Sequence, residues 1–97
     1  MTDVVGPGSL KLVVAHSPIR SLDDLISNAL TARAGVNDVR RFSDHAHLVF
    51  TDAEPSDIRS WLSAELESGE SLFVVEFERW SSYGASVDQR WLLRRGH

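Results

Sequence analysis

The order in which strand-type and helix-type segments follow one another constrains this chain more than any other feature. Strands are indicated by short apolar or alternating runs, and helices by apolar residues at three- and four-residue spacing. The runs that favour strands are residues 9–15, 36–42, 45–51 and 71–80. The segments that favour helices are residues 22–33, the stretch from Glu54-Pro55 to Gly69, and a short stretch after Ser86.

This order is β-α-β-β-α-β with a small helix at the C-terminus, which is the order of the ferredoxin-like split β-α-β fold. We therefore expect an α+β domain with an antiparallel sheet of four strands. The two longer helices are expected to pack on one face of the sheet, which leaves the opposite face to be covered.

Local signals support several of these boundaries. Ser21 with Asp24 three positions later resembles a capping box at the start of the first helix. Pro55 suits the first position of the second helix, because its fixed φ is compatible with a helix and it lacks an N–H. Ser43-Asp44 separates two alternating runs, so we expect an antiparallel hairpin there.

Size and composition indicate one domain and exclude some chemistry. The chain has 97 residues, enough for a single core, which we expect over residues 9–97 after a flexible leader over residues 1–8. It contains no cysteine, so disulfides and thiolate zinc sites are excluded, as is a cysteine nucleophile. No apolar run is long enough to span a bilayer and the N-terminus lacks the features of a signal peptide, so we expect a cytoplasmic protein.

The last strand-type run predicts which side chains form an interface. Phe73, Val75 and Phe77 would face one way, while Leu72, Val74 and Trp80 would face the other. We expect the face with Leu72, Val74 and Trp80 to be covered by a second subunit or another protein, together with Trp91 of the last helix. The alternative is cover by the C-terminal helix of the same chain.

Three histidines are candidates for chemistry. His16 ends the first strand, where it could act as a general base or bind a metal ion. The alternative is a strand-end residue that forms a hydrogen bond with a neighbouring carbonyl. His45 and His47 are two residues apart and therefore share one face of a strand, which suits a zinc or nickel ion if Glu76 or Glu78 supplies a third ligand. The alternative for this pair is a hairpin with surface histidines and no metal, and we expect no cofactor.

Basic residues give a weak indication of nucleic-acid binding. Arg40, Arg41 and Arg79 can contact phosphates. The net charge is −4, however, and an extended nucleic-acid footprint normally needs clustered basic residues. The alternative is that these arginines belong to ordinary solvated faces. Motifs for phosphate-binding loops and serine hydrolases are absent from the sequence.

The stretch "HLVFTDAEPSDIRSWLSAELESGESLFVVEF", with "RWLL" later, resembles small bacterial proteins described as SinR-like. These are relatives of the CRISPR-associated ferredoxin-fold endonucleases and of VapD-type toxins. The resemblance covers about residues 10–93. The matching positions are Thr51, Asp57-Ile58-Arg59, Leu62, Ser68-Gly69-Glu70, residues 72–75 and Trp91-Leu92.

This resemblance implies a ferredoxin-like homodimer. In the endonucleases an aspartate ends the first strand, and the two aspartates of the dimer are thought to hold a metal ion. The corresponding place here is Ala15-His16-Ser17, so the expected carboxylate is missing. Magnesium prefers oxygen ligands, and an imidazole is a poor replacement.

Three hypotheses follow. The first is a non-catalytic interaction module, a homodimer that binds a protein partner through its sheet and its C-terminal region. The second is a metal-dependent nuclease or toxin of the same fold, in which His16 is essential. The third is a nucleic-acid-binding regulator that uses Arg40 and Arg41. Because His16 stands where the endonucleases have an aspartate, we favour the first hypothesis and expect no enzyme activity.

Overall fold

The computed structural model describes residues 8–95, so the predicted leader lies outside the described residues except for Gly8. The strands are β1 (Ser9–His16), β2 (Val39–Ser43), β3 (Ala46–Thr51) and β4 (Ser71–Phe77). The helices are α1 (Asp23–Ala34), α2 (Pro55–Ser63) and α3 (Gln89–Arg95), with a 3₁₀ turn, η1 (Val36–Asp38), before β2. The chain is thus a mixed α+β structure.

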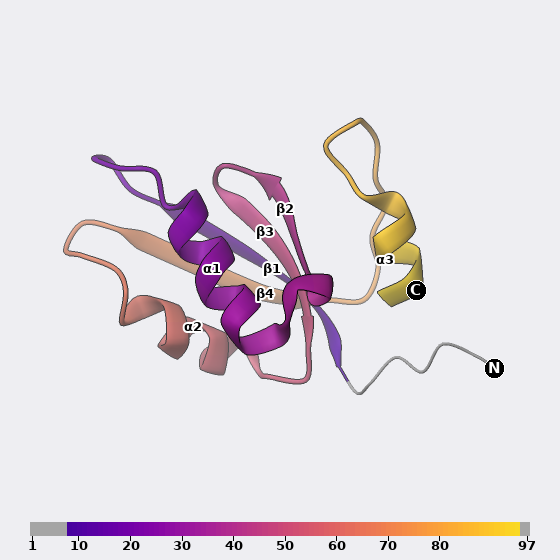
Figure 1. The fold of residues 1–97 in the computed structure, drawn as a ribbon, viewed down its shortest axis with the longest axis horizontal. Coiled ribbons are helices and arrows are strands. Elements are labelled where there is room, and N and C mark those ends of the chain that lie inside the picture. The colour runs from indigo at the N-terminus through magenta and orange to yellow at the C-terminus, as the bar shows by residue number, and fades with distance from the viewer. Residues whose placement is uncertain (1–7, 96–97) are drawn as a thin grey trace.

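The strands form one sheet in the order β2-β3-β1-β4, in which every neighbouring pair is antiparallel (Figure 1). The central strand, β1, pairs with β3 on one side and with β4 on the other. The edge strand β2 is irregular, since its register with β3 shifts between Arg41 and Ser43.

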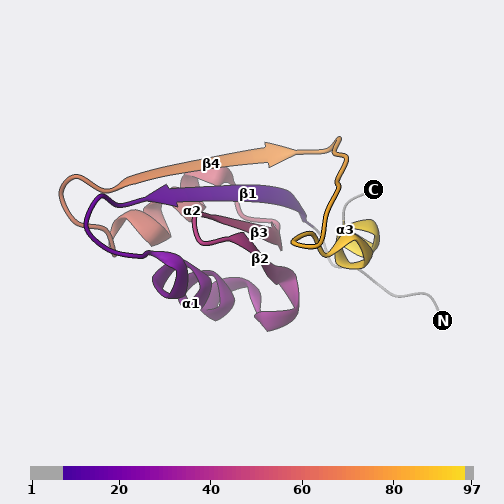
Figure 2. The same cartoon turned by 90° about the horizontal axis from the view of Figure 1, so that it is seen from above.

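Helices α1 and α2 pack on the same face of the sheet, as the sequence pattern predicts (Figure 2). Alternate residues of β1, Val13 and Ala15, point into this core. Burying a leucine or isoleucine side chain stabilises the fold by about 1.5–3 kcal/mol. The core residues are Val13, Ala15, Leu22, Ile26, Leu30, Val39, Val49, Ile58 and Leu62.

The second helix starts as predicted. Pro55 is its first residue, the Glu54 N–H donates to Asp57 Oδ2 at 3.1 Å, and the Asp57 N–H donates to the Glu54 carbonyl at 2.9 Å. The helix ends at Ser63, earlier than the predicted end near Gly69. Leu66, which follows it, still packs against the core from the loop.

Other boundaries differ from the predictions. Helix α1 starts at Asp23 after Leu22, without a side-chain capping hydrogen bond, so the capping box from Ser21 to Asp24 is wrong. The β2–β3 turn consists of Asp44 and His45, because Ser43 already pairs with Ala46. Strand β4 ends at Phe77, so Trp80 lies outside it.

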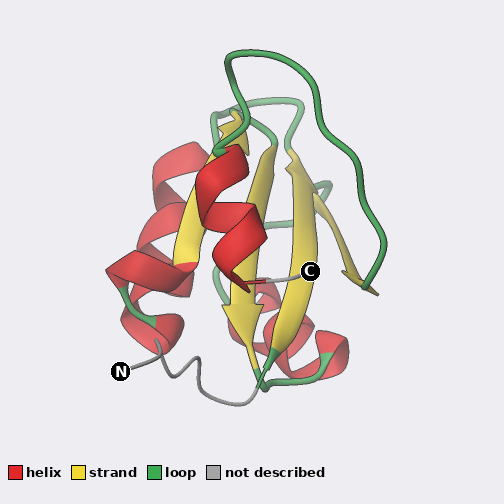
Figure 3. Cartoon of the chain, turned by 90° about the vertical axis from the view of Figure 1, so that its right-hand side faces the viewer, coloured by secondary structure: helices red, strands yellow, loops and turns green. Residues whose placement is uncertain are grey.

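Helix α3 packs at one end of the sheet face opposite α1 and α2. The chain reaches it through the long loop after β4, which is the green segment at the upper right of Figure 3. Asp88 precedes the helix, and its Oδ1 accepts from the Trp91 N–H at 3.0 Å. Asp88 therefore caps α3, not Ser86. Among residues 8–95, no helix has the length and apolarity that crossing a bilayer requires.

Candidate interaction surface

The centre of the sheet face away from α1 and α2 is apolar. The register places Leu10 between Phe50 and Phe77, and Leu12 between Leu48 and Val75. Val14 follows on the same face between Ala46 and Phe73. Because side chains alternate between the faces of a sheet, these nine residues form a continuous surface across β3, β1 and β4.

One end of this surface is covered by the C-terminal part of the same chain. Leu10 and Phe50 of the sheet form a buried cluster with Trp91 and Leu92 of α3. The residues that pack around this cluster are Leu48, Phe77, Trp80 and Val87. The other end carries no such cover within the described chain, and there Phe73 of β4 is 63% exposed.

Trp91 attaches α3 to the rest of the fold. It is only 4% exposed, and its indole Nε1 donates to the Asn37 carbonyl of η1 at 2.6 Å. The guanidinium groups of Arg40 and Arg95 lie over its ring, 5.4 and 5.9 Å from the centroid. Arg95 also donates from Nε to Asp38 Oδ1 at 2.8 Å. These contacts fix the position of α3.

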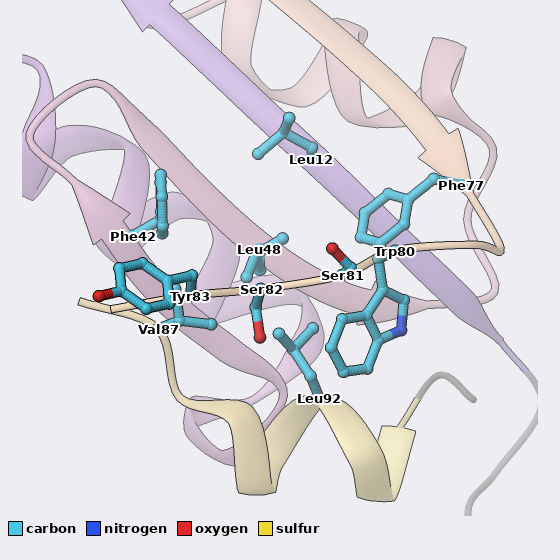
Figure 4. Close-up of a pocket in the computed structure, with 10 residues that line it drawn as sticks. All are labelled: Leu12, Phe42, Leu48, Phe77, Trp80, Ser81, Ser82, Tyr83, Val87 and Leu92. Atoms are coloured by element: carbon cyan, nitrogen blue, oxygen red, sulfur yellow. The ribbon is translucent and has the colours of Figure 1, made fainter. Parts of the chain in front are cut away.

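A pocket lies between the sheet, the loop after β4 and α3 (Figure 4). Its volume is about 460 Å³, which is within the range of pockets that bind small molecules. In Figure 4, Phe77, Trp80 and Leu92 gather at one end and Phe42, Tyr83 and Val87 at the other. Leu12, Leu48, Ser81 and Ser82 complete the lining.

The pocket suits an uncharged ligand group. None of its lining residues carries a charged side chain, and the side-chain hydroxyls come only from Ser81, Ser82 and Tyr83. Phe42 and Tyr83 at its rim are 43% and 99% exposed. Aromatic side chains with this exposure are common anchors of protein interfaces.

The structure corrects the predicted interface residues. Leu72 and Val74 pack against the core beneath α1 and α2, so the prediction that they lie on the open face is wrong. The open face carries Phe73, Val75 and Phe77 instead. Trp91 is buried within the chain, and Trp80 packs beside it. These two residues therefore fit the alternative, in which the C-terminal helix of the same chain covers the sheet.

Of the ten lining residues, only Trp80 was among the predicted interface residues, and Leu12, Phe42 and Tyr83 are among those that sequence reasoning missed. Tyr83 carried a signal, because a lone aromatic residue in the polar loop "SSYG" has no place in a helix or strand pattern. Phe42 carried little signal, since an aromatic residue near a strand end is as often buried as exposed.

The histidines divide into two groups. His16 is exposed at the end of β1, and its ring lies beside that of His45 in the β2–β3 turn, with centroids 6.2 Å apart. His47 is buried on the helix-covered face, so the expected pair of His45 and His47 on one strand face is not formed. Within residues 8–95, no group of three or more histidine, aspartate or glutamate side chains is placed to hold a metal ion.

His47 lies against the first turn of α1. Its Nε2 is 3.1 Å from Asp23 Oδ1, although the two atoms do not form a hydrogen bond. Arg41 Nε is 2.9 Å from the other oxygen of Asp23. Burial lowers the pKa of His47, and the carboxylate of Asp23 opposes this shift only in part. His47 is therefore an enclosed side chain whose protonation is disfavoured by burial.

Arg40 and Arg41 are both paired with carboxylates of the same chain. Arg40 Nε lies 3.0 Å from Asp88 Oδ2. Arg41 pairs with Asp23 and also with Asp44. Their charges are thus largely compensated before any phosphate approaches. Arg79 is exposed in the loop after β4 and is not close in sequence to the other two.

Comparison with known proteins yields no match: no family model fits the chain, and neither a curated protein nor a solved structure is significantly similar to it. The resemblance to the SinR-like proteins and their relatives therefore stays a prediction.

Proposed function

We propose that this chain is a non-catalytic interaction module with a ferredoxin-like fold, which forms a homodimer and binds a protein partner through the open face of its sheet and its C-terminal region. The observation that carries the proposal is the uncharged pocket of about 460 Å³ on a sheet face whose centre is apolar. An apolar surface with exposed aromatic residues is costly in water unless another molecule covers it.

The ferredoxin-like assignment rests on topology. Because neighbouring strands in the order β2-β3-β1-β4 are antiparallel, β1 and β2 run in the same direction with β3 between them. For the same reason β3 and β4 run in the same direction with β1 between them. Helices α1 and α2 make these two connections, which is the arrangement of a split β-α-β fold.

The assignment as a binding module, not an enzyme, rests on where the polar groups lie. His47 is enclosed against α1 beside Asp23, whose side chain is 20% exposed, and Arg41 is paired with Asp23. The pocket holds no ionisable group apart from the Tyr83 phenol. General acid–base catalysis needs a titratable group within reach of the bound ligand.

A capture experiment with matched variants tests the proposal. The tagged 97-residue chain is incubated with lysate, and both protein and nucleic acid are identified in the eluate. We expect a stoichiometric protein partner that is lost when Phe42 and Tyr83, both at the pocket rim, are replaced together by serine. Ile19→Ser is the control, because Ile19 is 72% exposed but lies in the loop after β1, away from the pocket.

Two outcomes would contradict the proposal. If the double variant captures the same protein as the wild type and the Ile19→Ser control, the pocket does not bind the partner. If nucleic acid is captured in place of a protein, and Arg40→Ala or Arg41→Ala weakens its salt-sensitive binding, the regulator hypothesis replaces the module.

A further inference from the structure

The two edges of the sheet differ in how well they are protected from pairing with another strand. Edge strand β2 has five residues, carries Arg40 and Arg41, and is interrupted by the register shift before Ser43. Such bulges and charged residues discourage edge-to-edge association. Edge strand β4 has seven residues and pairs with β1 without interruption from Ser71 to Phe77.

The sequence of β4, SLFVVEF, contains no proline, glycine, lysine or arginine. Its charged residue, Glu76, points to the helix-covered face, where its Oε1 lies 3.5 Å from Nζ of the buried Lys11. The outer side of β4 has no further strand beside it in the described chain, as Figure 2 shows along the upper boundary of the sheet. Its outward N–H and C=O groups are therefore available to another strand.

We infer that β4 pairs antiparallel with β4 of a second copy of this chain, and that the two sheets join into one of eight strands. This inference rests on the homodimer of the proposed function and not on its protein partner. A two-fold axis at Val74, the middle residue of the strand, allows all seven residues of each copy to pair.

This register is self-complementary. It places Glu76 opposite Leu72 of the other copy, so no like charges face each other within the strands. On the open face, Phe73 of each copy lies opposite Val75 of the other. Aromatic residues and β-branched residues are favourable cross-strand neighbours. The pairing thus covers the most exposed apolar side chain of the sheet, Phe73, at 63% exposure.

A second copy fits this edge better than a strand of a different protein. Two-fold pairing repeats each favourable contact, and it joins the open apolar faces of both copies into one continuous surface. Helix α2 packs beneath β4 on the other face of the sheet. Phe73 and Val75 do not line the pocket, whereas Phe77 does. The pairing therefore reaches the pocket only at Phe77, the last residue of the strand.

Sedimentation of the 97-residue chain over a range of concentrations tests the inference. We expect a reversible dimer whose dissociation constant rises at least about tenfold in Phe73→Arg, which places a charge in the pairing strand. Ile19→Arg is the matched control, because it makes the same kind of change at an exposed apolar residue far from β4. A monomer at all concentrations overturns the inference, as does a dimer that both variants leave unchanged.

Disulfide trapping tests the register, since the chain has no cysteine of its own. We expect a mixture of Phe73→Cys and Val75→Cys to give an oxidised dimer more efficiently than either variant alone, because these two positions face each other across the axis. Equal trapping of Ile19→Cys overturns the assigned contact. A monomer that still captures its partner overturns this inference and the homodimer of the proposed function, but it leaves the protein partner in place. A β4-linked dimer without a pocket-dependent partner contradicts the partner binding of the proposed function and leaves this inference in place.

Discussion

Replacing Trp91 tests whether α3 is an integral part of the fold. The side chain is 4% exposed, packs against Leu10 and Phe50 on the sheet, and donates a hydrogen bond of 2.6 Å to the Asn37 carbonyl. The substitutions Trp91→Phe and Trp91→Ala separate these contributions. The first keeps an aromatic ring but removes the indole N–H, and the second also removes the ring.

The magnitudes follow from these contacts. A typical hydrogen bond contributes about 1 kcal/mol net, and Arg95 Nη2 remains 3.4 Å from the same Asn37 carbonyl, so we expect Trp91→Phe to cost about 1 kcal/mol. Truncating a buried tryptophan to alanine costs about 3–5 kcal/mol. In a domain of this size each 1 kcal/mol lowers the melting temperature by roughly 4–8 °C.

Thermal and urea unfolding followed by circular dichroism measure these changes. Leu93→Ala is the control, because Leu93 lies on the same helix but is 53% exposed, and its truncation is expected to change stability by no more than about 0.5 kcal/mol. Hydrogen exchange of the α3 amides shows whether the helix detaches before the rest of the fold opens. If Trp91→Ala were as stable as Leu93→Ala, with unchanged exchange in α3, the reasoning would be refuted.

Two further predictions concern pH. Burial lowers the pKa of His47 below its ordinary value of 6.5, so the unfolded chain binds a proton at His47 more readily than the folded chain, and stability decreases as the pH falls below about 6.5. His47→Gln should reduce that decrease, measured by urea unfolding at a series of pH values, and an unchanged dependence of stability on pH would contradict the assignment. Hydrogen bonds from Arg20 lower the pKa of Glu70 from 4.5 to about 2, so the stabilisation from this carboxylate is present above about pH 4.5 and is lost as the pH falls towards 2. Glu70→Gln should therefore lose less stability than the wild type over this pH interval, whereas an equal loss in both proteins would argue against the Arg20–Glu70 ion pair.

Local patterns predicted the elements well where the signal was itself local. Pro55 with Glu54 gave the start of α2, because proline at the first helical position has its effect within one turn. The alternation of β4 was also predicted correctly, since Phe73, Val75 and Phe77 share one face and Leu72 and Val74 the other. The cap of α3 was assigned to Ser86 and is Asp88, because several polar residues in that loop suit the same position.

The candidate surface was only partly predictable. Both faces of β4 are apolar, and a strand of this kind does not reveal which face the helices cover. The sequence pattern therefore led to the wrong face for Leu72 and Val74. The proximity of His16 to His45 was equally hidden, because it depends on the pairing of β1 with β3.

The sequence by itself determined the order of the elements, the alternation of the strands and the two-helix core, because each depends on residues within a few positions of one another. Only the tertiary structure decided which sheet face stays open, where α3 docks, and which polar groups are enclosed. The hydrogen bond from Trp91 spans 54 residues to Asn37, and the ion pair from Arg40 spans 48 to Asp88. Contacts over such separations depend on how the sheet and helices pack, and no local spacing encodes them.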